Sequence, residues 1–212
     1  MAGELVIIGA GGHGRVCADV ASAAGFDLVG FCDCAMTPGE EVNAIKVVGR
    51  APGDLPSSFD VGKTFAFAAL GDNARRMDVL NELKALGFRI PTLVHPTASI
   101  SPSAEIGEGT VVVAQAAINA NAKVGRGCIL NTTCSIDHDN VLEEGVHVCP
   151  GVHAAGGVVF GEQAFIGTGA SIVPGVRIGA RAVVAAGAVV TSDVPDGVTV
   201  NGVPAAPISS RG

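Results

Sequence analysis

One histidine of this chain stands between two carboxylates, in the order Asp137-His138-Asp139. An imidazole that has one ring nitrogen held by a carboxylate can accept a proton at its other nitrogen near neutral pH. His138 follows the aliphatic Ile136 by two positions, so we expect it to face outward if Ile136 faces a core. We interpret His138 as a candidate general base, and a solvated surface histidine is the alternative.

A second group of residues could bind phosphate. The sequence Gly9-Ala10-Gly11-Gly12-His13-Gly14 follows a short apolar strand and precedes a helix. Glycines with this spacing let backbone amides and a helix amino end approach a phosphate group, although the motif alone is weak support. Asp33, at the end of the next strand, could accept from a ribose hydroxyl or a base imide.

The remaining polar side chains do not suggest a metal site. The six cysteines form no CxxC pair, and no His/Cys/Asp cluster has the spacing of a closed metal site, so we expect no metal. Cys128 and Cys134 fall where the repeats described below otherwise have Ala, which predicts small buried thiols rather than disulfides. We interpret His95 and His153 as structural.

The larger part of the chain has a period of six. From Ile100 to Val190, every sixth residue is aliphatic or a close substitute. Neither an α-helix nor an ordinary strand has this period, which indicates a parallel β-helix of hexapeptide repeats. Three repeats would form a triangular coil of about 18 residues. The position after each aliphatic residue is often Gly or Asn, as at Gly107, Asn119 and Gly125, and we expect the positive φ of the corners there.

The first part of the chain alternates strands and helices. The expected elements are strands at 5–8, 28–32 and 64–70 and helices at 15–24 and 74–86. This rhythm predicts an α/β, Rossmann-like domain over residues 1–92 with a parallel sheet, followed by the β-helix domain over 93–212. About 90 residues are too few for both halves of a dinucleotide fold. A mononucleotide-sized ligand such as UDP is therefore favoured over NAD.

Composition limits the partners and the location. The chain has 212 residues, 48% of them hydrophobic, and a formal net charge of −7. This charge argues against nucleic acid and anionic membranes as partners. No apolar run has the length of a membrane span, and the amino terminus lacks a basic segment followed by an apolar stretch. We therefore expect a cytoplasmic protein.

Apolar residues that should face outward suggest self-association. Val111, Val113 and Val159 are expected on the outer surface of the β-helix, where a neighbouring copy could cover them. A triangular prism with one cleft at each edge closes under three-fold symmetry, so our hypothesis is a homotrimer.

Five motifs, in this order, resemble a known family: GAGGHGRV at 9–16, GDN at 71–73, HPTASISPSAEIGEG at 95–109, NTTCSIDHD at 131–139 and NGVPA at 201–205. The chain resembles the bacterial nucleotide-amino-sugar N-acetyltransferases of bacillosamine and perosamine synthesis, whose members are often labelled sialic acid O-acetyltransferases. The resemblance covers essentially the whole chain. It implies a left-handed β-helix, acetyl-CoA as co-substrate, no metal, and a nucleotide-linked amino sugar, favoured to be a UDP-4-amino-4,6-dideoxy sugar, as acceptor.

The resemblance also implies roles for single residues. The catalytic His–acid pair of the family falls on His138 and Asp139. His147 would approach the thioester from a neighbouring chain and stabilise the oxyanion. Backbone contacts to acetyl-CoA fall on Gly156, Thr168 and Ala186.

The substrate contacts implied by the resemblance fall mostly in the first domain. They are Gly11, Gly12, His13, Arg15, Asp33, Gly71 and Asn73, with Asn131 of the repeats near the acceptor sugar. The chain departs from the family at Gly14 and Arg15, where Ala and Lys are common, and at Cys34, where some relatives carry a second acid.

Several functions are compatible with these observations. The leading hypothesis is an acetyl-CoA-dependent N-acetyltransferase in which His138 accepts the proton of the attacking amine. Within the same class, the alternative is a sialic acid or other sugar O-acetyltransferase. A non-catalytic, nucleotide-binding trimeric scaffold and an NAD-dependent oxidoreductase are alternatives of other classes.

Overall fold

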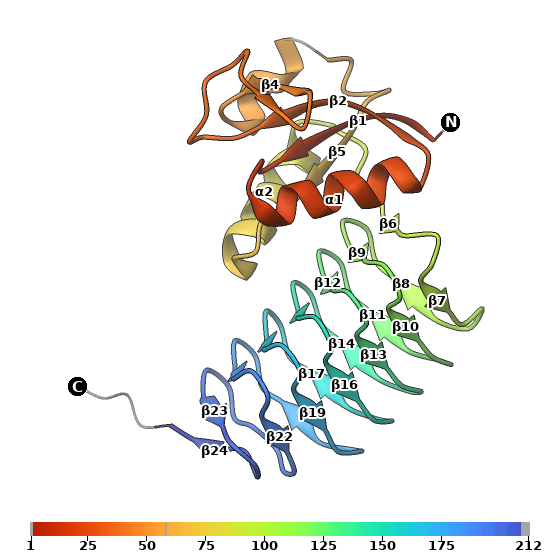
Figure 1. Ribbon diagram of the computed structural model, residues 1–212, viewed down its shortest axis with the longest axis vertical. Coiled ribbons are helices and arrows are strands. Elements are labelled where there is room, and N and C mark those ends of the chain that lie inside the picture. Colours follow the sequence, from red (N-terminus) through yellow and green to blue (C-terminus); the bar gives the residue numbers. More distant parts are fainter. Residues whose placement is uncertain (1, 58, 209–212) are drawn as a thin grey trace. The chain divides into compact units, whose positions relative to one another are not determined.

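The computed structural model describes residues 2–57 and 59–208. The chain forms two compact units, Met1–Pro96 and Thr97–Gly212 (Figure 1). The sequence places the boundary after residue 92, whereas the contacts divide the chain after Pro96. Strand β6 (Leu93–Val94) accounts for the difference, because it packs against helix α1 (Gly12–Ala23) of the first unit.

The first unit contains a five-stranded sheet in the order β3-β4-β2-β1-β5. Its strands are β1 (Gly3–Ile8), β2 (Phe26–Cys32), β3 (Glu41–Val42), β4 (Ile45–Gly49) and β5 (Phe65–Ala68). Strands β4, β2, β1 and β5 are parallel, which confirms the predicted parallel sheet of a Rossmann-like domain. The strand expected at 64–70 is shorter than expected at both ends.

Two further features are not predicted from the sequence: the hairpin of β3 and β4 and the 3₁₀ helix η1 (Pro52–Ser57) that follows it. The hairpin turns at Asn43 and Ala44, which have φ of 50° and 63°. Two consecutive positive φ angles are typical of a tight hairpin turn, but the usual signal for such a turn is Asn-Gly. Here the turn is Asn43-Ala44, so the sequence lacks the glycine that would have predicted it.

The two helices of this unit are α1 and α2 (Asn73–Ala85). Helix α1 begins at Gly12 rather than at residue 15, so two of the motif glycines lie inside the helix. A Cβ added to Gly14 would collide with the carbonyl oxygen of Gly9, so a glycine here lets the helix pack closely on the end of β1. Asp72 caps α2 by accepting a hydrogen bond from the Arg75 amide at 2.8 Å.

The second unit is a β-solenoid of short strands, all but one of two residues, stacked in three sheets and drawn from green to blue in Figure 1. The first face contains β7 (Ser99–Ile100), β10 (Ala117–Ile118), β13 (Ser135–Ile136), β16 (His153–Ala154), β19 (Ser171–Ile172) and β22 (Val189–Val190). The second face contains β8 (Glu105–Ile106), β11 (Lys123–Val124), β14 (Val141–Leu142), β17 (Val159–Phe160) and β20 (Arg177–Ile178). The third face contains β9 (Val111–Val112), β12 (Ile129–Leu130), β15 (His147–Val148), β18 (Phe165–Ile166), β21 (Val183–Val184) and β23 (Thr199–Asn201), to which β24 (Ala206–Pro207) adds as an antiparallel strand.

The predicted period of six is confirmed. Each aliphatic residue of the series is the second residue of its strand, and from Val112 to Val190 all of these side chains are buried. Parallel strands pair with the strand three later in the chain, as Ile118 does with Ile136, so equivalent residues lie above one another in columns. The stacked flats are consistent with the predicted left-handed β-helix. Burial of these columns supplies the core that a single repeat lacks.

The expected position of positive φ is wrong. Positive φ occurs three residues after the aliphatic residue, as at Gly109, Asn121 and Asp139, and not directly after it. The glycines directly after it have a different function, because there the backbone approaches the next coil. A Cβ on Gly107 would lie 2.6 Å from the backbone nitrogen of Arg126.

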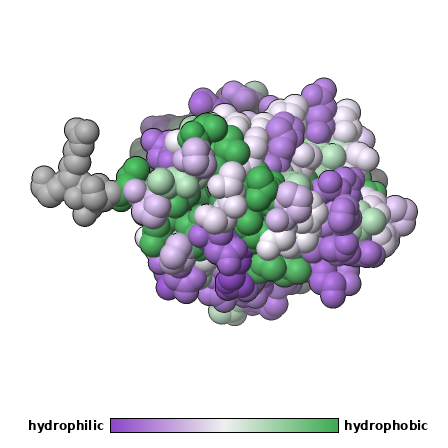
Figure 2. Space-filling model, turned by 90° about the horizontal axis from the view of Figure 1, so that it is seen from below, coloured by the Kyte–Doolittle hydropathy of each residue, from purple (hydrophilic) through white to green (hydrophobic). Residues whose placement is uncertain are grey.

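The exposure of the apolar residues expected on the outer surface of the β-helix also differs in part from the prediction. Val111 and Val113 are buried within the chain itself, so they need no partner chain to cover them. Val159 is half-buried, and Val141, its partner on the second face, is 37% exposed. Figure 2 shows hydrophobic and hydrophilic side chains interspersed on the side seen from below. Neither helix in the described part of the chain is long and apolar enough to cross a membrane.

Candidate active site

His138 lies at the corner that follows the first face, which we call the first corner. The ring nitrogen Nδ1 of His138 is 2.8 Å from Oδ2 of Asp139. Asp137 binds the same segment from the other side, because its Oδ1 accepts a hydrogen bond from the His138 amide at 2.8 Å. The His138 side chain is 60% exposed. The imidazole therefore has one nitrogen held by a carboxylate and its other nitrogen, Nε2, available to an incoming proton.

The 18-residue register places three further residues around this pair. Asn119 Nδ2 donates to Asp137 Oδ1 at 3.0 Å, and Asn121 Nδ2 donates to Asp139 Oδ1 at 3.2 Å. On the opposite side, the His138 ring lies over Gly156, where an added Cβ would come within 2.5 Å of Nε2. Neither asparagine is predicted from the sequence as part of the site, although each lies 18 residues before one of the two acids, a spacing that equals one coil.

The carboxylates tune the protonation of His138. The hydrogen bond that His138 donates to Asp139, and then the charge of Asp137, raise the pKa of His138 above its ordinary value of 6.5. The pKa of Asp139 is lowered by its hydrogen bonds with His138 and Asn121, and the pKa of Asp137 is lowered by those with Asn119 and the His138 amide. Both acids are therefore ionised where His138 titrates, which suits a base held by a carboxylate.

His147 directly precedes the inward Val148 in β15 on the third face, and the residue is only 8% exposed. The ring packs edge-on against Phe165, with centroids 5.0 Å apart and planes at 78°. The neighbouring coils carry apolar side chains at this position, Ile129 before His147 and Phe165 after it. The burial comes from these neighbours, which the period of six does not reveal.

The other residues proposed for acetyl-CoA lie at two different corners. Gly156 lies at the first corner, beside His138. Thr168 and Ala186 lie at the corner that follows the third face, which we call the third corner, and both are exposed. Asn131 lies at the same corner and is half-buried. A single chain thus brings His138, Asp139 and Gly156 together, but it does not bring them together with Thr168 and Ala186.

The first unit has a cavity of about 450 Å³ at the carboxyl ends of β1, β2 and β5. Ligands of open parallel sheets bind at this edge. The lining residues are Ile8, Gly9, Cys32, Asp33, Cys34, Arg50, Ala51, Pro52, Leu70, Gly71, Asp72, Arg75, Val79 and Glu82. The Asp33 carboxylate ties two loops together, since it accepts hydrogen bonds from the Ala10 and Ala35 amides at 2.8 and 2.9 Å.

Only part of the predicted nucleotide contacts line this cavity. Asp33 and Gly71 do, whereas Gly11, Gly12 and Arg15 are exposed around the start of α1. Asn73 instead accepts a hydrogen bond from the buried guanidinium of Arg76 at 2.8 Å. Of the four motif glycines, Gly12 and Gly14 lie within the helix, and Gly9 is the one that lines the cavity.

His13, another predicted substrate contact, lies in the first turns of α1 and does not line the cavity. Its Nε2 is 3.5 Å from the Sγ of the buried Cys17. Burial and then the charge of Arg76 lower the pKa of His13 to about 4. The ring is thus neutral at neutral pH, and its contact with Cys17 lies within α1, one turn further along the helix.

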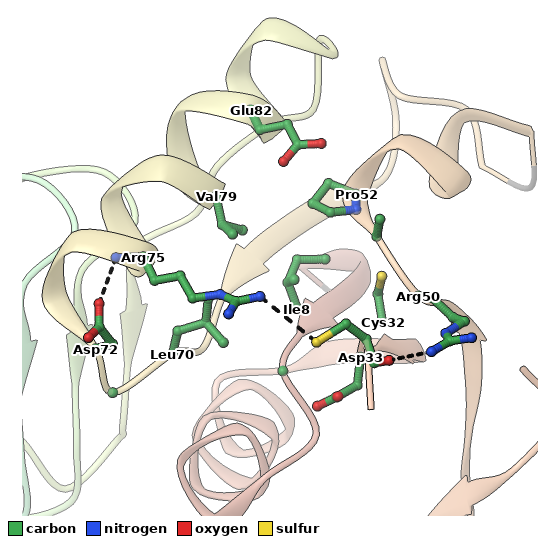
Figure 3. A pocket seen from close by; sticks show the side chains of 14 residues that line it. Ile8, Cys32, Asp33, Arg50, Pro52, Leu70, Asp72, Arg75, Val79 and Glu82 are labelled. Atoms are coloured by element: carbon green, nitrogen blue, oxygen red, sulfur yellow. Dashed lines mark hydrogen bonds between the residues drawn. The ribbon is translucent and has the colours of Figure 1, made fainter. Parts of the chain in front are cut away.

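Two arginines of the cavity are missed by the sequence analysis. Arg50 Nη2 donates to the carbonyl oxygen of Cys34 at 2.8 Å, and Arg75 Nη2 lies 3.9 Å from the Cys34 sulfur. Figure 3 shows the two guanidinium groups approaching the same loop from opposite sides of the cavity. Arg50 follows the end of β4 and Arg75 belongs to α2. Both lie near Cys34 because of the order of the strands in the sheet, which residue spacing does not reveal.

If the cavity binds the predicted UDP, Arg75→Ala should weaken that binding at least about tenfold, because its guanidinium would contribute a charge-assisted hydrogen bond to a phosphate. Isothermal titration with UDP measures this effect. Lys63→Ala is the matched control, since it removes an exposed cation of the same unit that pairs with Asp60 and lies outside the cavity lining. Equal affinities for the two variants would contradict a phosphate role for Arg75.

The cysteines of the repeats are buried, as predicted. Cys128 and Cys134 lie inside the solenoid, and burial raises the pKa of Cys134 to about 12. None of the six cysteines is part of a disulfide. Within the described ranges, no three His, Cys, Asp or Glu side chains are grouped in a way that could hold a metal ion.

Two family models match the chain. The PglD N-terminal domain matches residues 4–83, and the bacterial transferase hexapeptide family, with six repeats, matches residues 157–192. The first match covers most of the α/β unit, and the second lies in the later coils of the solenoid.

Several solved structures are similar to this chain over almost its whole length. The acetyltransferase domain of PglB from Neisseria gonorrhoeae, solved with acetyl coenzyme A, shares 41% identity over 97% of this chain and 98% of that chain, with a TM-score of 0.91. PerB from Caulobacter crescentus, solved with CoA and GDP-perosamine, shares 39% identity over 98% of both chains, also with a TM-score of 0.91. WeeI from Acinetobacter baumannii shares 26% identity over 96% of this chain and 99% of that chain, with a TM-score of 0.88.

Proposed function

Because the chain belongs to the family of bacterial nucleotide-amino-sugar N-acetyltransferases, we propose that it transfers the acetyl group of acetyl-CoA to the amine of a UDP-4-amino-4,6-dideoxy sugar. The chain is an acyltransferase by this membership. The identity of the sugar and of the nucleotide is our proposal, and PerB, which was solved with GDP-perosamine, makes GDP the first alternative.

The observation that carries the proposal is the contact of 2.8 Å between His138 Nδ1 and Asp139 Oδ2 at an exposed corner. The contact favours the tautomer with the proton on Nδ1, so that Nε2 presents a lone pair to the acceptor amine. A solvated surface histidine would need neither the carboxylate nor the space over Gly156.

The reaction proceeds in two steps on this geometry. The amine nitrogen attacks the thioester carbonyl carbon, and His138 Nε2 takes the proton that the nitrogen loses as the tetrahedral intermediate forms. The intermediate then collapses, the carbon–sulfur bond breaks, and CoA leaves as a thiol after His138 returns the proton. Asp139 stabilises the imidazolium that exists between these two steps.

The cavity of the first unit is our candidate for the nucleotide. Arg50 and Arg75 supply two positive charges for a diphosphate, and Asp33 supplies an acceptor for a ribose hydroxyl or a base imide. The acidic chain as a whole would repel a free anion, so we expect local arginines to provide the affinity.

We further propose that the active form is a homotrimer. His138 lies at the first corner, and Thr168 and Ala186 lie at the third corner, so a complete acetyl-CoA site requires the edges of two chains. The exposed Val141 and half-buried Val159 on the second face are available for such a contact. Sedimentation of a stable monomer at micromolar concentration would contradict this assembly.

A thiol-release assay with acetyl-CoA tests the proposed reaction. The acceptors are UDP-, GDP- and dTDP-linked 4-amino-4,6-dideoxy sugars, with a free sialic acid as the arm for O-acetylation. We expect the UDP-amino sugar to release CoA fastest, and mass spectrometry to locate the acetyl group on nitrogen. Release with sialic acid alone would replace the proposal by the O-acetyltransferase, and release with none would favour a scaffold.

The pH dependence of turnover should follow the protonation of His138. The base is active only when unprotonated, so kcat should fall as the pH drops through the pKa of His138, which lies above 6.5. Asp139→Asn removes the main cause of that raised pKa, so we expect the acidic limb of its kcat profile at lower pH and a lower plateau. An unchanged limb in this variant would mean that another group titrates.

A further inference from the structure

We propose that Asn119 and Asn121 are positioning residues, which hold the carboxylates on both sides of His138 and so keep its imidazole in the orientation that accepts the proton. The inference deepens the proposed function and rests on it, because it concerns the orientation of the same base. Both asparagines belong to the coil before His138, and nothing in the local sequence around His138 points to them.

The pair of His138 and Asp139 needs support from outside. The two side chains are neighbours in sequence and are 60% and 58% exposed. An exposed pair of this kind gains little from its mutual attraction and loses side-chain freedom when it forms. Without a further contact, the Asp139 carboxylate would rotate and release Nδ1.

Asn121 supplies that contact for Asp139. The two oxygens of the carboxylate are bound in different directions, Oδ2 by His138 Nδ1 at 2.8 Å and Oδ1 by Asn121 Nδ2 at 3.2 Å. Rotation of the carboxylate would break one of these bonds. An ionised carboxylate accepts and does not donate, so the asparagine must present its NH₂ group, which determines the orientation of the amide as well.

Asn119 has the corresponding contact on the other side. Its Nδ2 donates to Asp137 Oδ1 at 3.0 Å, and the same oxygen accepts from the His138 amide at 2.8 Å. The carboxylate thus connects the backbone of His138 to the coil before it. Together, the two asparagines restrain the segment 137–139 at both ends.

A neutral donor is the suitable partner here. A lysine or arginine could hold the carboxylates equally well, but its charge would oppose the proton on His138. The corners packed against His138, residues 119–121 and 155–157, carry no charged side chain. The charged groups that face His138 are therefore Asp137 and Asp139, and the amides restrain these acids without cancelling their field.

The test uses Asn121→Gly. Asn121 has a φ of 59°, which glycine adopts without strain, so this change removes the amide and leaves the corner intact. In ¹⁵N spectra of histidine-labelled full-length protein, with His138→Asn to assign the signal, wild-type His138 should show mainly the tautomer with the proton on Nδ1. In Asn121→Gly we expect mixed tautomers and a pKa closer to 6.5. Asn119→Ala should show a smaller change of the same sign.

Turnover is the second readout. We expect Asn121→Gly to lower kcat about tenfold with an unchanged KM for acetyl-CoA, because orientation is lost and binding is not. Gln115→Gly is the matched control, since Gln115 also lies at a corner with a positive φ, of 61°, and its backbone N–H donates to Thr97 Oγ1, a bond that glycine keeps. Its His138 signals and its kcat should equal those of the wild type.

The titration decides the proposal independently of the reaction. If His138 of folded Asn121→Gly keeps the wild-type tautomer and pKa, the positioning role is wrong, whatever its turnover. If the wild type acetylates none of the sugars, the proposed function is wrong, whereas a changed tautomer in Asn121→Gly would still establish that the asparagine orients the ring.

Discussion

Replacing His138 by alanine should lower kcat by about 10²- to 10⁴-fold, which is the contribution of a well-placed general base. The amine must lose a proton as it attacks the thioester, and among the residues of the first corner His138 is the side chain with a basic nitrogen near neutral pH. The KM for acetyl-CoA should change little, because this interaction is made with the reacting nitrogen and not with CoA. Thiol-release kinetics at saturating acceptor measure both constants.

His153→Ala is the control for this prediction. His153 is also exposed and lies in the next coil of the same face, with its Nδ1 2.8 Å from Ser135 Oγ. Its removal should leave turnover at the wild-type level. Wild-type turnover in His138→Ala, with retained fold by circular dichroism, would show that the base is elsewhere.

Gly156→Ala should be the second most damaging change, with a loss of kcat of about 10²-fold. A methyl group at this position would come within 2.5 Å of His138 Nε2 and 3.0 Å of Nδ1, so the ring must move away from its place beside Asp139. The backbone of Gly156 has no positive φ, so the corner itself tolerates alanine. We therefore expect a folded protein with a displaced base.

A double-mutant cycle separates this mechanism from a contact between Gly156 and acetyl-CoA. If the methyl group acts through the His138 ring, Gly156→Ala should have almost no further effect in a His138→Ala background. If Gly156 instead contacts the pantetheine, the KM for acetyl-CoA should rise in both backgrounds. Additive losses of kcat would contradict the steric mechanism.

Much of the fold can be predicted from the spacing of apolar residues. The series from Ile100 to Val190 identifies every strand of the three faces up to β22, because each inward side chain requires one short flat and the next coil repeats it. The hairpin of β3 and β4 escapes prediction because its turn has Ala44 in place of glycine. The location of positive φ escapes it because glycine is needed for two different reasons in each repeat.

At the first corner, some residues of the candidate site can be predicted from the sequence and others cannot. The triplet Asp137-His138-Asp139 is visible as a candidate base because residue types and neighbours suffice to suggest the chemistry. Asn119, Asn121 and Gly156 become its surroundings only when coils of 18 residues stack. In the first unit, similarly, Asp33 is predictable from the end of its strand, whereas Arg50 and Arg75 are not.

The solenoid and the parallel sheet can therefore be predicted from the amino-acid sequence, since both depend on local periodicity, and residue types alone lead to our proposal that His138 is the proton acceptor. The tertiary structure decided which side chains surround that acceptor, which predicted contacts line the cavity, and which outward residues are buried. The reason is physical: periodicity specifies the direction of each side chain within its own coil or strand. Orientation, burial and pKa depend on groups that come from neighbouring coils and strands, and only packing brings these groups within hydrogen-bond distance.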